Sequence, residues 1–414
     1  MDKQFYINNR KKLGSYLDNK SVAVIFAGKE ICKSLDESIP FGVDRSFYYF
    51  TGIQEQNDIL MLVKDGKTRS VMFINPYDEY EAKWVGRKLF PNEVTDISGV
   101  EAIRYLKEFD DAVLEYAKNG YKIYLDKTPC LFPEPYTEER RLIEKLASNK
   151  YETSDLREFI AKIRMSKNDE EVDYIKKAIH ITNLGLQKIM TELKPGLYEY
   201  QVESFFDQTI KYNGASGHAF ETIAATGKNA CVLHYRANDA LLKDGDLMLF
   251  DLGAEYKLYK SDISRTYPVN GKFSPRQRQI YDIVLRAQEV ARKEMKPGAY
   301  LKDVNQAVID FYKVELKKIG LIKEDNEVSK YYFHSVSHTI GLDTHDISGR
   351  NMPLEVGSII SNEPGLYIAE EGIGIRVEDD MLITENGAIY LSDEIIKDPE
   401  EIQKFMAKGE WKWN

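Results

Sequence analysis

Residues 247–269, LMLFDLGAEYKLYKSDISRTYPV, contain two apolar runs separated by a polar turn, a pattern that predicts a β-hairpin. Asp251 ends the first apolar run and Asp262 opens the second, so the hairpin would bring two carboxylates together. Buried carboxylates repel each other unless they share a proton or a cation, and a metal site is one physical solution. Taken alone, two acids that face solvent at strand ends explain the same pattern.

The segments around this hairpin predict two domains, because 414 residues exceed the roughly 100–200 residues of an average domain. Over residues 1–160, apolar runs alternate with helical segments, which indicates an α/β domain. The strands expected there are 21–28, 45–52, 122–126 and two strands within 58–75 that join at Lys64–Gly66, and the expected helix is 99–119.

Residues 161–414 form the second expected domain, which mixes helices and strands. Helical periodicity over residues 169–213 and again over 275–319 is followed each time by hairpin-like apolar runs. Ser166 is placed to cap the first helix. The layout predicts a structural pseudo-repeat, although the two halves share no evident sequence identity.

The composition indicates an ordinary soluble protein, since no window approaches the roughly 18 uninterrupted apolar residues of a membrane-spanning helix. The first residues lack the apolar core of a secretory signal, and three scattered cysteines suit a reducing compartment, so we expect a cytoplasmic protein. The net charge of −10 is spread along the chain, which argues against a nucleic-acid partner.

Three of the six histidines lie within HSVSHTIGLDTHD, residues 334–346. Such clustering of His334, His338 and His345 suggests metal binding or proton handling, because imidazole is a common metal ligand that titrates near neutral pH. The alternative is that these histidines cap turns around Gly341 and Gly349.

The other three histidines are isolated in the sequence. His234 ends an apolar run in NACVLHYRAND, where a lone histidine is more often structural than functional. His180 and His218 are expected at the surface or in packing contacts.

Two acids of the last third also interrupt apolar runs. Glu363 precedes a Pro-Gly turn in IISNEPGLYI, and Glu378 lies in GIGIRVEDDMLIT. In the second segment, alternation places Arg376, Glu378 and Asp380 on one face of an expected strand, which a solvated edge would also explain. With the acids of the hairpin and one histidine, these residues make a donor set suited to manganese, iron, cobalt or zinc, and two ions fit it better than one.

Five motifs occur in an order that resembles the pita-bread metallopeptidases of family M24, which include methionine aminopeptidase, Xaa-Pro aminopeptidase and prolidase. The motifs are DLGAEY, SDISRTYPV, SHTIGLDTHD, NEPGLYI and GIRVEDD. The resemblance implies a pita-bread domain over residues 161–414 and two divalent metal ions, with manganese favoured and zinc, cobalt or iron as alternatives. It implies five metal ligands: Asp251, Asp262, His338, Glu363 and Glu378.

By the same resemblance, Asp262 and Glu378 bridge the two ions, and Glu363 also moves a proton from the attacking water toward the leaving nitrogen. Four further residues match positions that bind substrate and stabilise the tetrahedral intermediate in proline-specific members, namely His234, His334, His345 and Arg376. Ser335 and Val336 depart from the residues that are frequent in relatives, but they remove no ligand.

The N-terminal part narrows the resemblance to aminopeptidase P, because FGVDRSFYYFTGIQEQN is similar to a segment of its creatinase-like N-terminal domain. EAKWVGRKLF is similar to a segment that sets a tryptophan at the active site, in some cases that of a neighbouring subunit, which makes Trp84 a substrate-contact candidate. Alternatively, Trp84 is a core or interface aromatic residue.

The expected activity is therefore hydrolysis of the N-terminal Xaa-Pro bond of peptides by a metal-bridging hydroxide. One alternative is prolidase, which cleaves Xaa-Pro dipeptides, and another is a non-catalytic peptide-binding homologue. A homodimer or a higher homo-oligomer is the expected assembly. The sequence leaves open the preference for dipeptides, the physiological metal, the preferred first residue and whether Trp84 acts in trans.

Overall fold

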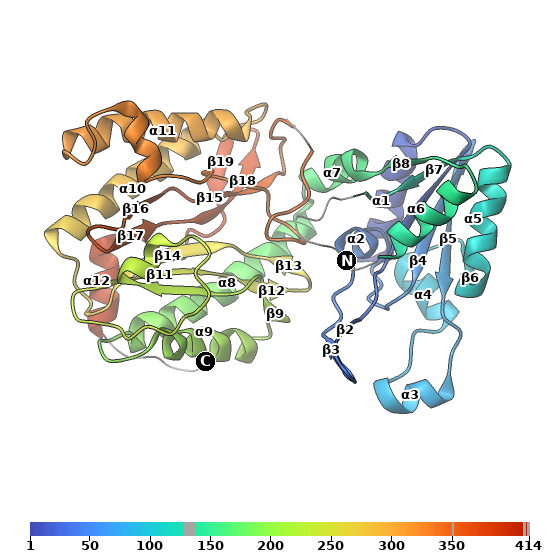
Figure 1. Cartoon of the computed structure of the whole chain (residues 1–414), viewed down its shortest axis with the longest axis horizontal. Coiled ribbons are helices and arrows are strands. Elements are labelled where there is room, and N and C mark those ends of the chain that lie inside the picture. Colours follow the sequence, from blue (N-terminus) through green and yellow to red (C-terminus); the bar gives the residue numbers. More distant parts are fainter. Residues whose placement is uncertain (128–136, 350–351, 409–410, 412–414) are drawn as a thin grey trace. The chain divides into compact units, whose positions relative to one another are not determined.

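Figure 1 presents the computed structural model, which describes residues 1–127, 137–349, 352–408 and 411. The chain divides into two compact units, unit 1 (Met1–Ile163) and unit 2 (Arg164–Asn414). Within the described ranges, no helix has both the length and the apolar character that crossing a bilayer requires.

A six-stranded mixed sheet of order β6-β5-β4-β1-β7-β8 forms the centre of unit 1. Its strands are β1 (Ser21–Phe26), β4 (Ile59–Asp65), β5 (Lys67–Ile74), β6 (Ala102–Tyr105), β7 (Lys122–Leu125) and β8 (Thr153–Asp155). Every residue of β1 is buried, as is typical of a central strand that is covered on both faces. A separate exposed hairpin consists of β2 (Ile31–Ser34) and β3 (Glu37–Ile39).

Helices cover both faces of this sheet, which confirms an α/β fold for the N-terminal part. The helices are α1 (Lys3–Tyr16), α2 (Arg45–Thr51), α3 (Glu79–Val85), α4 (Pro91–Ser98), η1 (Leu106–Glu108), α5 (Phe109–Lys118) and α6 (Glu138–Ser148). One face of β1 shares its core with α5 and α6, whereas α1 and α2 contact β4. None of the residues of α3 is buried.

Two elements of unit 1 differ from the sequence prediction. Residues 45–51 form helix α2 rather than a strand, because the Asp44 side chain accepts from the N–H of Phe47 and Gly52 ends the helix in the left-handed region. Residues 102–105 form strand β6, since they pair with β5, and the predicted helix begins only at Phe109.

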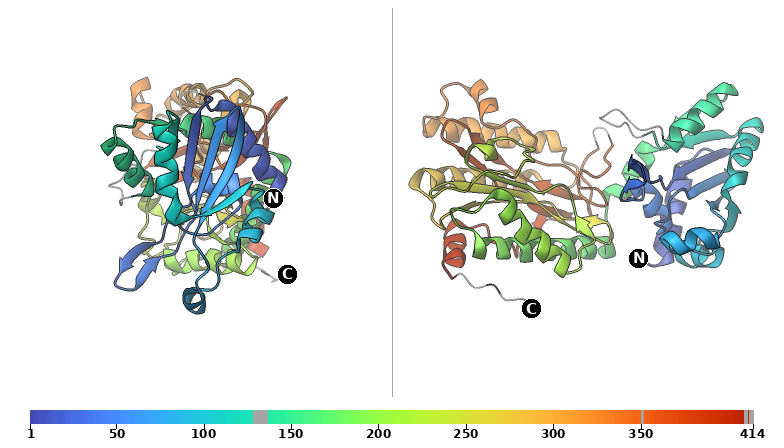
Figure 2. Two further views of the ribbon diagram at one scale, coloured as in Figure 1. Left: turned by 90° about the vertical axis from the view of Figure 1, so that its right-hand side faces the viewer. Right: turned by 60° about the horizontal axis from the view of Figure 1, so that its bottom comes forward.

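Unit 2 contains two helix pairs, each followed by strands, in the predicted order. The pairs are α8 (Asp169–Glu192) with α9 (Glu199–Tyr212) and α10 (Pro275–Glu294) with α11 (Leu301–Lys318). They flank the strands of this unit on opposite sides (Figures 1 and 2). The cap of α8 is Asn168 rather than Ser166, because Asn168 and Glu171 exchange side-chain and backbone hydrogen bonds.

The remaining elements of the chain are short. The helical ones are α7 (Arg157–Met165), which contains the division between the units, η2 (Gly227–Cys231), η3 (Asp325–Lys330) and α12 (Pro399–Lys408). The strands of the first half of unit 2 are β9 (Gly217–His218), β10 (Ile223–Thr226), β11 (Leu247–Leu252), β12 (Ala254–Tyr256), β13 (Tyr259–Lys260) and β14 (Ile263–Pro268). Those of the second half are β15 (Ile359–Asn362), β16 (Gly365–Ile368), β17 (Ile373–Arg376), β18 (Asp379–Thr384) and β19 (Gly387–Tyr390).

The strands of unit 2 form sheets β10-β11-β14, β13-β12-β9, β15-β18-β19 and β16-β17. The two halves join where the backbone N–H of Glu378, which follows β17, donates to the carbonyl oxygen of Ser264 in β14 at 3.0 Å. All residues of β14 and β17 are buried. The ends of these strands therefore meet in the interior of unit 2.

Candidate metal centre

The predicted hairpin forms and carries two of the acids. Strand β11 pairs antiparallel with β14, and Asp251 lies opposite Ser264. Asp262 immediately precedes β14 and is 3% exposed. The chain between β11 and β14 turns at Lys257 and Leu258. The two arms of this excursion approach closely at Gly253, where an added Cβ would lie 1.9 Å from the Ser261 carbonyl oxygen, an approach that only glycine permits.

The other two acids come from the second half. Glu378 lies between β17 and β18, and its Oε2 accepts a hydrogen bond from Ser264 Oγ at 2.7 Å. Glu363 lies between β15 and β16, and its Oε1 accepts from Ser361 Oγ at 3.2 Å. Its backbone N–H donates to the Val336 carbonyl oxygen, which ties this corner to the histidine-rich segment.

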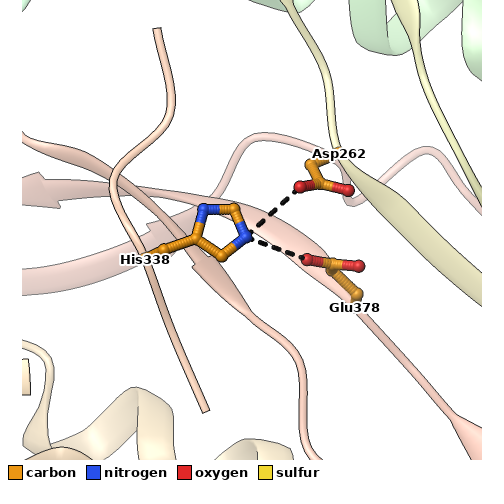
Figure 3. Close-up of side chains that lie close together, drawn as sticks. All are labelled: Asp262, His338 and Glu378. Atoms are coloured by element: carbon orange, nitrogen blue, oxygen red, sulfur yellow. Dashed lines mark ion pairs between the residues drawn. The ribbon is translucent and has the colours of Figure 1, made fainter. Parts of the chain in front are cut away.

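His338 joins the acids of both halves (Figure 3). Its Nε2 lies 3.3 Å from Asp262 Oδ2, 3.4 Å from Glu363 Oε1 and 4.0 Å from Glu378 Oε1. Its Nδ1 lies 3.2 Å from the Thr339 carbonyl oxygen, to which it can only donate, so Nε2 carries the lone pair when the ring is neutral. Fixing the tautomer in this way is typical of a metal-binding histidine.

The crowding of these groups perturbs their ionisation. Burial raises the pKa of Asp262 to about 6 and that of Glu363 to about 7, and it raises the pKa of Glu378 well above its usual range. Burial lowers the pKa of His338, but the Asp262 and Glu363 carboxylates outweigh burial and raise it to about 9. A site of this kind favours bound positive charge.

Donor geometry gives the same indication. Ligand atoms of Asp262, His338 and Glu378 lie within 4.8 Å of one another. Glu378 Oε1 and Asp251 Oδ1 are buried without a hydrogen-bond partner, which is costly unless a cation occupies the space. These donors fit a divalent metal ion. Asp251 and Glu363 lie outside this tight group, and we call all five residues, Asp251, Asp262, His338, Glu363 and Glu378, the inner cluster.

Arg376 is tied into the inner cluster rather than directed toward solvent. Its guanidinium donates to Ser264 Oγ at 2.7 Å, to Tyr367 Oη at 2.9 Å and to Asp251 Oδ2 at 2.7 Å, and the residue is 4% exposed. The expected strand through Arg376 and Glu378 is interrupted at residues 377–378. The solvated-edge reading is wrong, because Arg376, Glu378 and Asp380 are all buried.

Tyr367 is a residue that sequence reasoning missed. Its hydroxyl accepts from Arg376 and donates to Nε2 of His334 at 2.9 Å, because Nδ1 of His334 donates to the Ser335 carbonyl oxygen. Burial and the nearby Arg376 lower the pKa of His334 to about 4, so the ring is neutral near pH 7. One sequence feature could have pointed to Tyr367: it lies in an apolar run that predicts a buried strand, and a buried tyrosine hydroxyl needs a hydrogen-bond partner.

His345 and His234 lie farther out, and with His334 we call them the outer histidines. The ring centroids of His345 and His338 are 4.3 Å apart, and burial together with His338 lowers the pKa of His345 to about 4. His234 follows η2, is exposed, and is close enough to His334 and His345 to lower the pKa of each.

The remaining candidates lie elsewhere. Trp84 belongs to unit 1, where it is 75% exposed on α3 beside Tyr80, so it is not a core residue of that unit. His180 and His218 pair with surface carboxylates, Glu394 at 3.2 Å and Asp207 at 3.3 Å, as their structural interpretation predicted.

Comparison with known proteins identifies both parts of the chain. Residues 173–385 match metallopeptidase family M24, and residues 6–124 match the N-terminal domain of aminopeptidase P. The chain is 32% identical to the Xaa-Pro aminopeptidase of Escherichia coli, with 98% of each chain aligned.

Solved structures agree with this similarity. A Bacillus anthracis protein provisionally assigned as an aminopeptidase P has a TM-score of 0.95 and 40% identity, with 99% of each chain covered. Aminopeptidase P from Escherichia coli with the inhibitor Pro-Leu has a TM-score of 0.89 and 32% identity, also with 99% of each chain covered. The similarity extends over both units.

Proposed function

The chain belongs to metallopeptidase family M24, and from this premise we propose that it is an Xaa-Pro aminopeptidase, which hydrolyses the bond between the first residue of a peptide and a proline in second position. The observation that carries the proposal is the group of Asp262, His338 and Glu378, with its unpartnered buried oxygens, in a chain that aligns with such enzymes along its whole length.

We propose that the inner cluster holds two divalent ions. Its four carboxylates and one imidazole supply the hard oxygen donors and the nitrogen that such ions bind. When bound, the ions supply Lewis acidity toward the peptide carbonyl and lower the pKa of water. Manganese is the proposed metal, because the donors are mostly carboxylates. Metal analysis of protein purified without added metal, followed by reactivation with single metals, tests this choice.

The residues around the cluster would handle protons and charge. Glu363 is the proposed general base and acid, since its carboxylate lies within 4 Å of both His338 Nε2 and His334 Nδ1 and its pKa is raised by burial to about 7. His345 is neutral near pH 7, so it can offer one N–H donor to a peptide oxygen without carrying a charge. The only N–H of the neutral His334 ring already donates to the Ser335 carbonyl oxygen, so His334 would line the substrate site rather than donate to it.

Substrate selection would depend on the outer histidines and Arg376. A bond before proline is a tertiary amide without an N–H, so the enzyme must recognise the carbonyl, the ring and the free amine instead. His234, His334 and His345 are proposed to contact the substrate. Arg376 is proposed to hold Asp251 and Tyr367 in place next to the substrate. The three hydrogen bonds that Arg376 donates support this role.

We also propose a homodimer in which Trp84 contacts the partner or its substrate. Helix α3 has no buried residue, and it exposes Tyr80, Trp84 and Val85 by 72%, 75% and 74%. A helix that buries nothing within its own unit is a plausible contact element for a second copy. Analytical ultracentrifugation of the protein and of Trp84→Ala tests this; a monomeric wild-type protein contradicts it.

The domain boundary is proposed at residues 160 and 161, which the division after Ile163 supports. The proposed compartment is the cytoplasm, since Cys32 is an exposed free thiol that suits a reducing environment. Limited proteolysis tests the boundary, and cell fractionation tests the compartment.

The decisive experiment compares turnover of an Xaa-Pro-Xaa tripeptide with turnover of an Xaa-Pro dipeptide by manganese-loaded protein. Strong preference for the tripeptide is expected. Preference for the dipeptide would reassign the protein as a prolidase. No turnover, in protein that binds no divalent metal, would leave only a peptide-binding role.

A further inference from the structure

A buried carboxylate outside the inner cluster holds the segment that carries His234. Glu199 is the first residue of α9 and is 0% exposed. Each of its two carboxylate oxygens accepts two hydrogen bonds. The four donors are Thr226 N–H at 2.7 Å and Asn229 Nδ2 at 3.2 Å on Oε1, and Tyr235 Oη at 2.9 Å and Ala240 N–H at 2.9 Å on Oε2.

All four donors belong to residues 226–240, and they lie on both sides of His234 in the sequence. Tyr235 is the next residue after His234, and its hydroxyl also accepts from Asn229 Nδ2 at 3.0 Å. One carboxylate therefore fixes both ends and the middle of this segment. Neutral donors of this segment occupy all four acceptor positions of the carboxylate, so Glu199, which is anchored in α9, holds the segment in place.

The opposite side of the segment packs on β17. An added Cβ at Gly374 would lie 2.3 Å from the Ala230 carbonyl oxygen, so η2 and β17 approach closely only because residue 374 is glycine. The thiol of Cys231 donates to the Ile373 carbonyl oxygen at 3.5 Å. Since β17 ends at Arg376, this packing connects the segment to the inner cluster.

We propose that Glu199 is a positioning residue for the reaction, which holds residues 226–240 so that the exposed ring of His234 stays beside His334 and His345. The inference rests on the substrate-contact role proposed for His234. It assigns no contact with substrate or metal to Glu199, because this carboxylate is fully buried and saturated with hydrogen bonds.

Glu199→Gln tests the proposal. The amide keeps the size of the side chain but turns an NH2 group toward two donors, so two of the four hydrogen bonds are lost. We expect kcat/KM to fall about 10- to 100-fold, the range typical of losing an outer partner of a reactive group. The double variant Glu199→Gln/His234→Ala should have a kcat/KM less than about twofold below that of His234→Ala alone. The reason is that both substitutions remove the same contribution, that of a correctly placed His234.

Glu171→Gln is the matched control. Glu171 is also a buried carboxylate near the start of a helix, where it accepts from Tyr259 Oη and from the Asn168 N–H, but its donors lie outside residues 226–240. Any effect of Glu171→Gln on kcat/KM should combine additively, in free-energy terms, with the effect of His234→Ala. If the effect of Glu199→Gln on kcat/KM is as additive with that of His234→Ala as the effect of Glu171→Gln is, Glu199 has only a general structural role and the inference is overturned.

Hydrogen exchange of the metal-free proteins gives a readout that is independent of activity. Glu199→Gln should speed exchange in peptides that cover residues 226–240 and leave β11 and β15 unchanged, whereas Glu171→Gln should not affect 226–240. Unchanged exchange in 226–240 overturns the inference. Should Glu199→Gln fail to fold, Tyr235→Phe, which removes one of the four bonds, must show the same pattern at smaller size.

The proposed peptidase activity and the positioning role of Glu199 can fail separately. If the wild-type protein turns over no Xaa-Pro peptide, the proposed function falls, while the exchange measurement still decides whether Glu199 holds the segment. If wild-type turnover is normal and His234→Ala is fully active, the positioning role falls and the peptidase activity stands.

Discussion

The inner cluster and the outer histidines belong to the same unit but depend on different parts of the fold. The acids of the inner cluster lie at the ends of paired strands, where backbone hydrogen bonds such as Glu378 N–H to Ser264 O fix them. The outer histidines lie in loops, and two of them, His234 and His345, are exposed. Strand ends thus hold the carboxylates in place, while loops carry the histidines that we propose contact the substrate.

This difference predicts that metal retention and substrate turnover can be changed independently. A substitution in the inner cluster should remove the metal and the activity together. A substitution among the outer histidines should lower turnover and leave the metal bound.

Glu378→Ala and Asp262→Ala should each abolish activity. Even an outer partner of a metal ligand is worth about 10- to 100-fold in affinity or activity, so loss of a carboxylate that we propose as a metal ligand should exceed about 100-fold. Turnover of an Xaa-Pro tripeptide and metal content by mass spectrometry measure the effect. Glu394→Ala, which removes a surface acid paired with His180, is the control. Full activity with normal metal content in either variant would contradict the assignment of the inner cluster.

His345→Ala should lower kcat by about 100- to 1,000-fold, the range typical of losing one donor to a developing oxyanion. Metal content should stay at the wild-type level, because His345 contacts the ring of His338 and is not among the proposed metal ligands. Steady-state kinetics with metal analysis checks both quantities. If the metal is lost with the activity, His345 supports the inner cluster and the proposed separation is wrong.

Read singly, most residues of the inner cluster also had a structural explanation, and the order of the five motifs in the resemblance singled out the set. A physical argument agrees with part of it. Each acid interrupts an apolar run, and apolar runs become buried strands, so an acid at the strand end must be paired, protonated or bound to a cation. The structure brings Asp262, His338 and Glu378 together as this reasoning requires.

The partners of Arg376 and the role of Tyr367 could not be predicted, because they depend on which strands lie side by side. Tyr367 meets Arg376 only because β16 pairs with β17 in one register, and Ser264 reaches both Arg376 and Glu378 only because β14 lies against them. Alternation in one strand does not contain this information. For the same reason, residues 102–105 were predicted as helix although pairing with β5 makes them a strand.

Tyr367→Phe should have a smaller effect than either change above, because it removes a hydroxyl that links the two regions but removes no ligand. The hydroxyl accepts from Arg376 and donates to His334, so the variant leaves two buried groups each short of one partner. We expect the free energy of unfolding to fall by about 1–3 kcal/mol and kcat/KM to fall by less than about tenfold. Chemical denaturation and kinetics measure the two effects. Loss of metal in this variant would contradict the prediction.

His334 should also contribute to the pH dependence of stability. Burial and Arg376 hold its folded-state pKa at about 4, below the value of about 6.5 for an unfolded histidine. Between these values the unfolded chain binds more protons, so stability rises with pH from about 4 to about 6.5 and is lost on acidification. His334→Gln should flatten this dependence by at most about 1.4 kcal/mol per pH unit.

Denaturant titrations of wild type and His334→Gln at several pH values measure that difference, and the shared titration of the inner cluster largely cancels in it. His180→Gln, at the surface, is the matched control. If wild type and His334→Gln lose stability in parallel below pH 6.5, His334 is not held neutral. The outer histidines would then be charged groups like those of the inner cluster, and the contrast between a charged centre and a neutral rim would not hold.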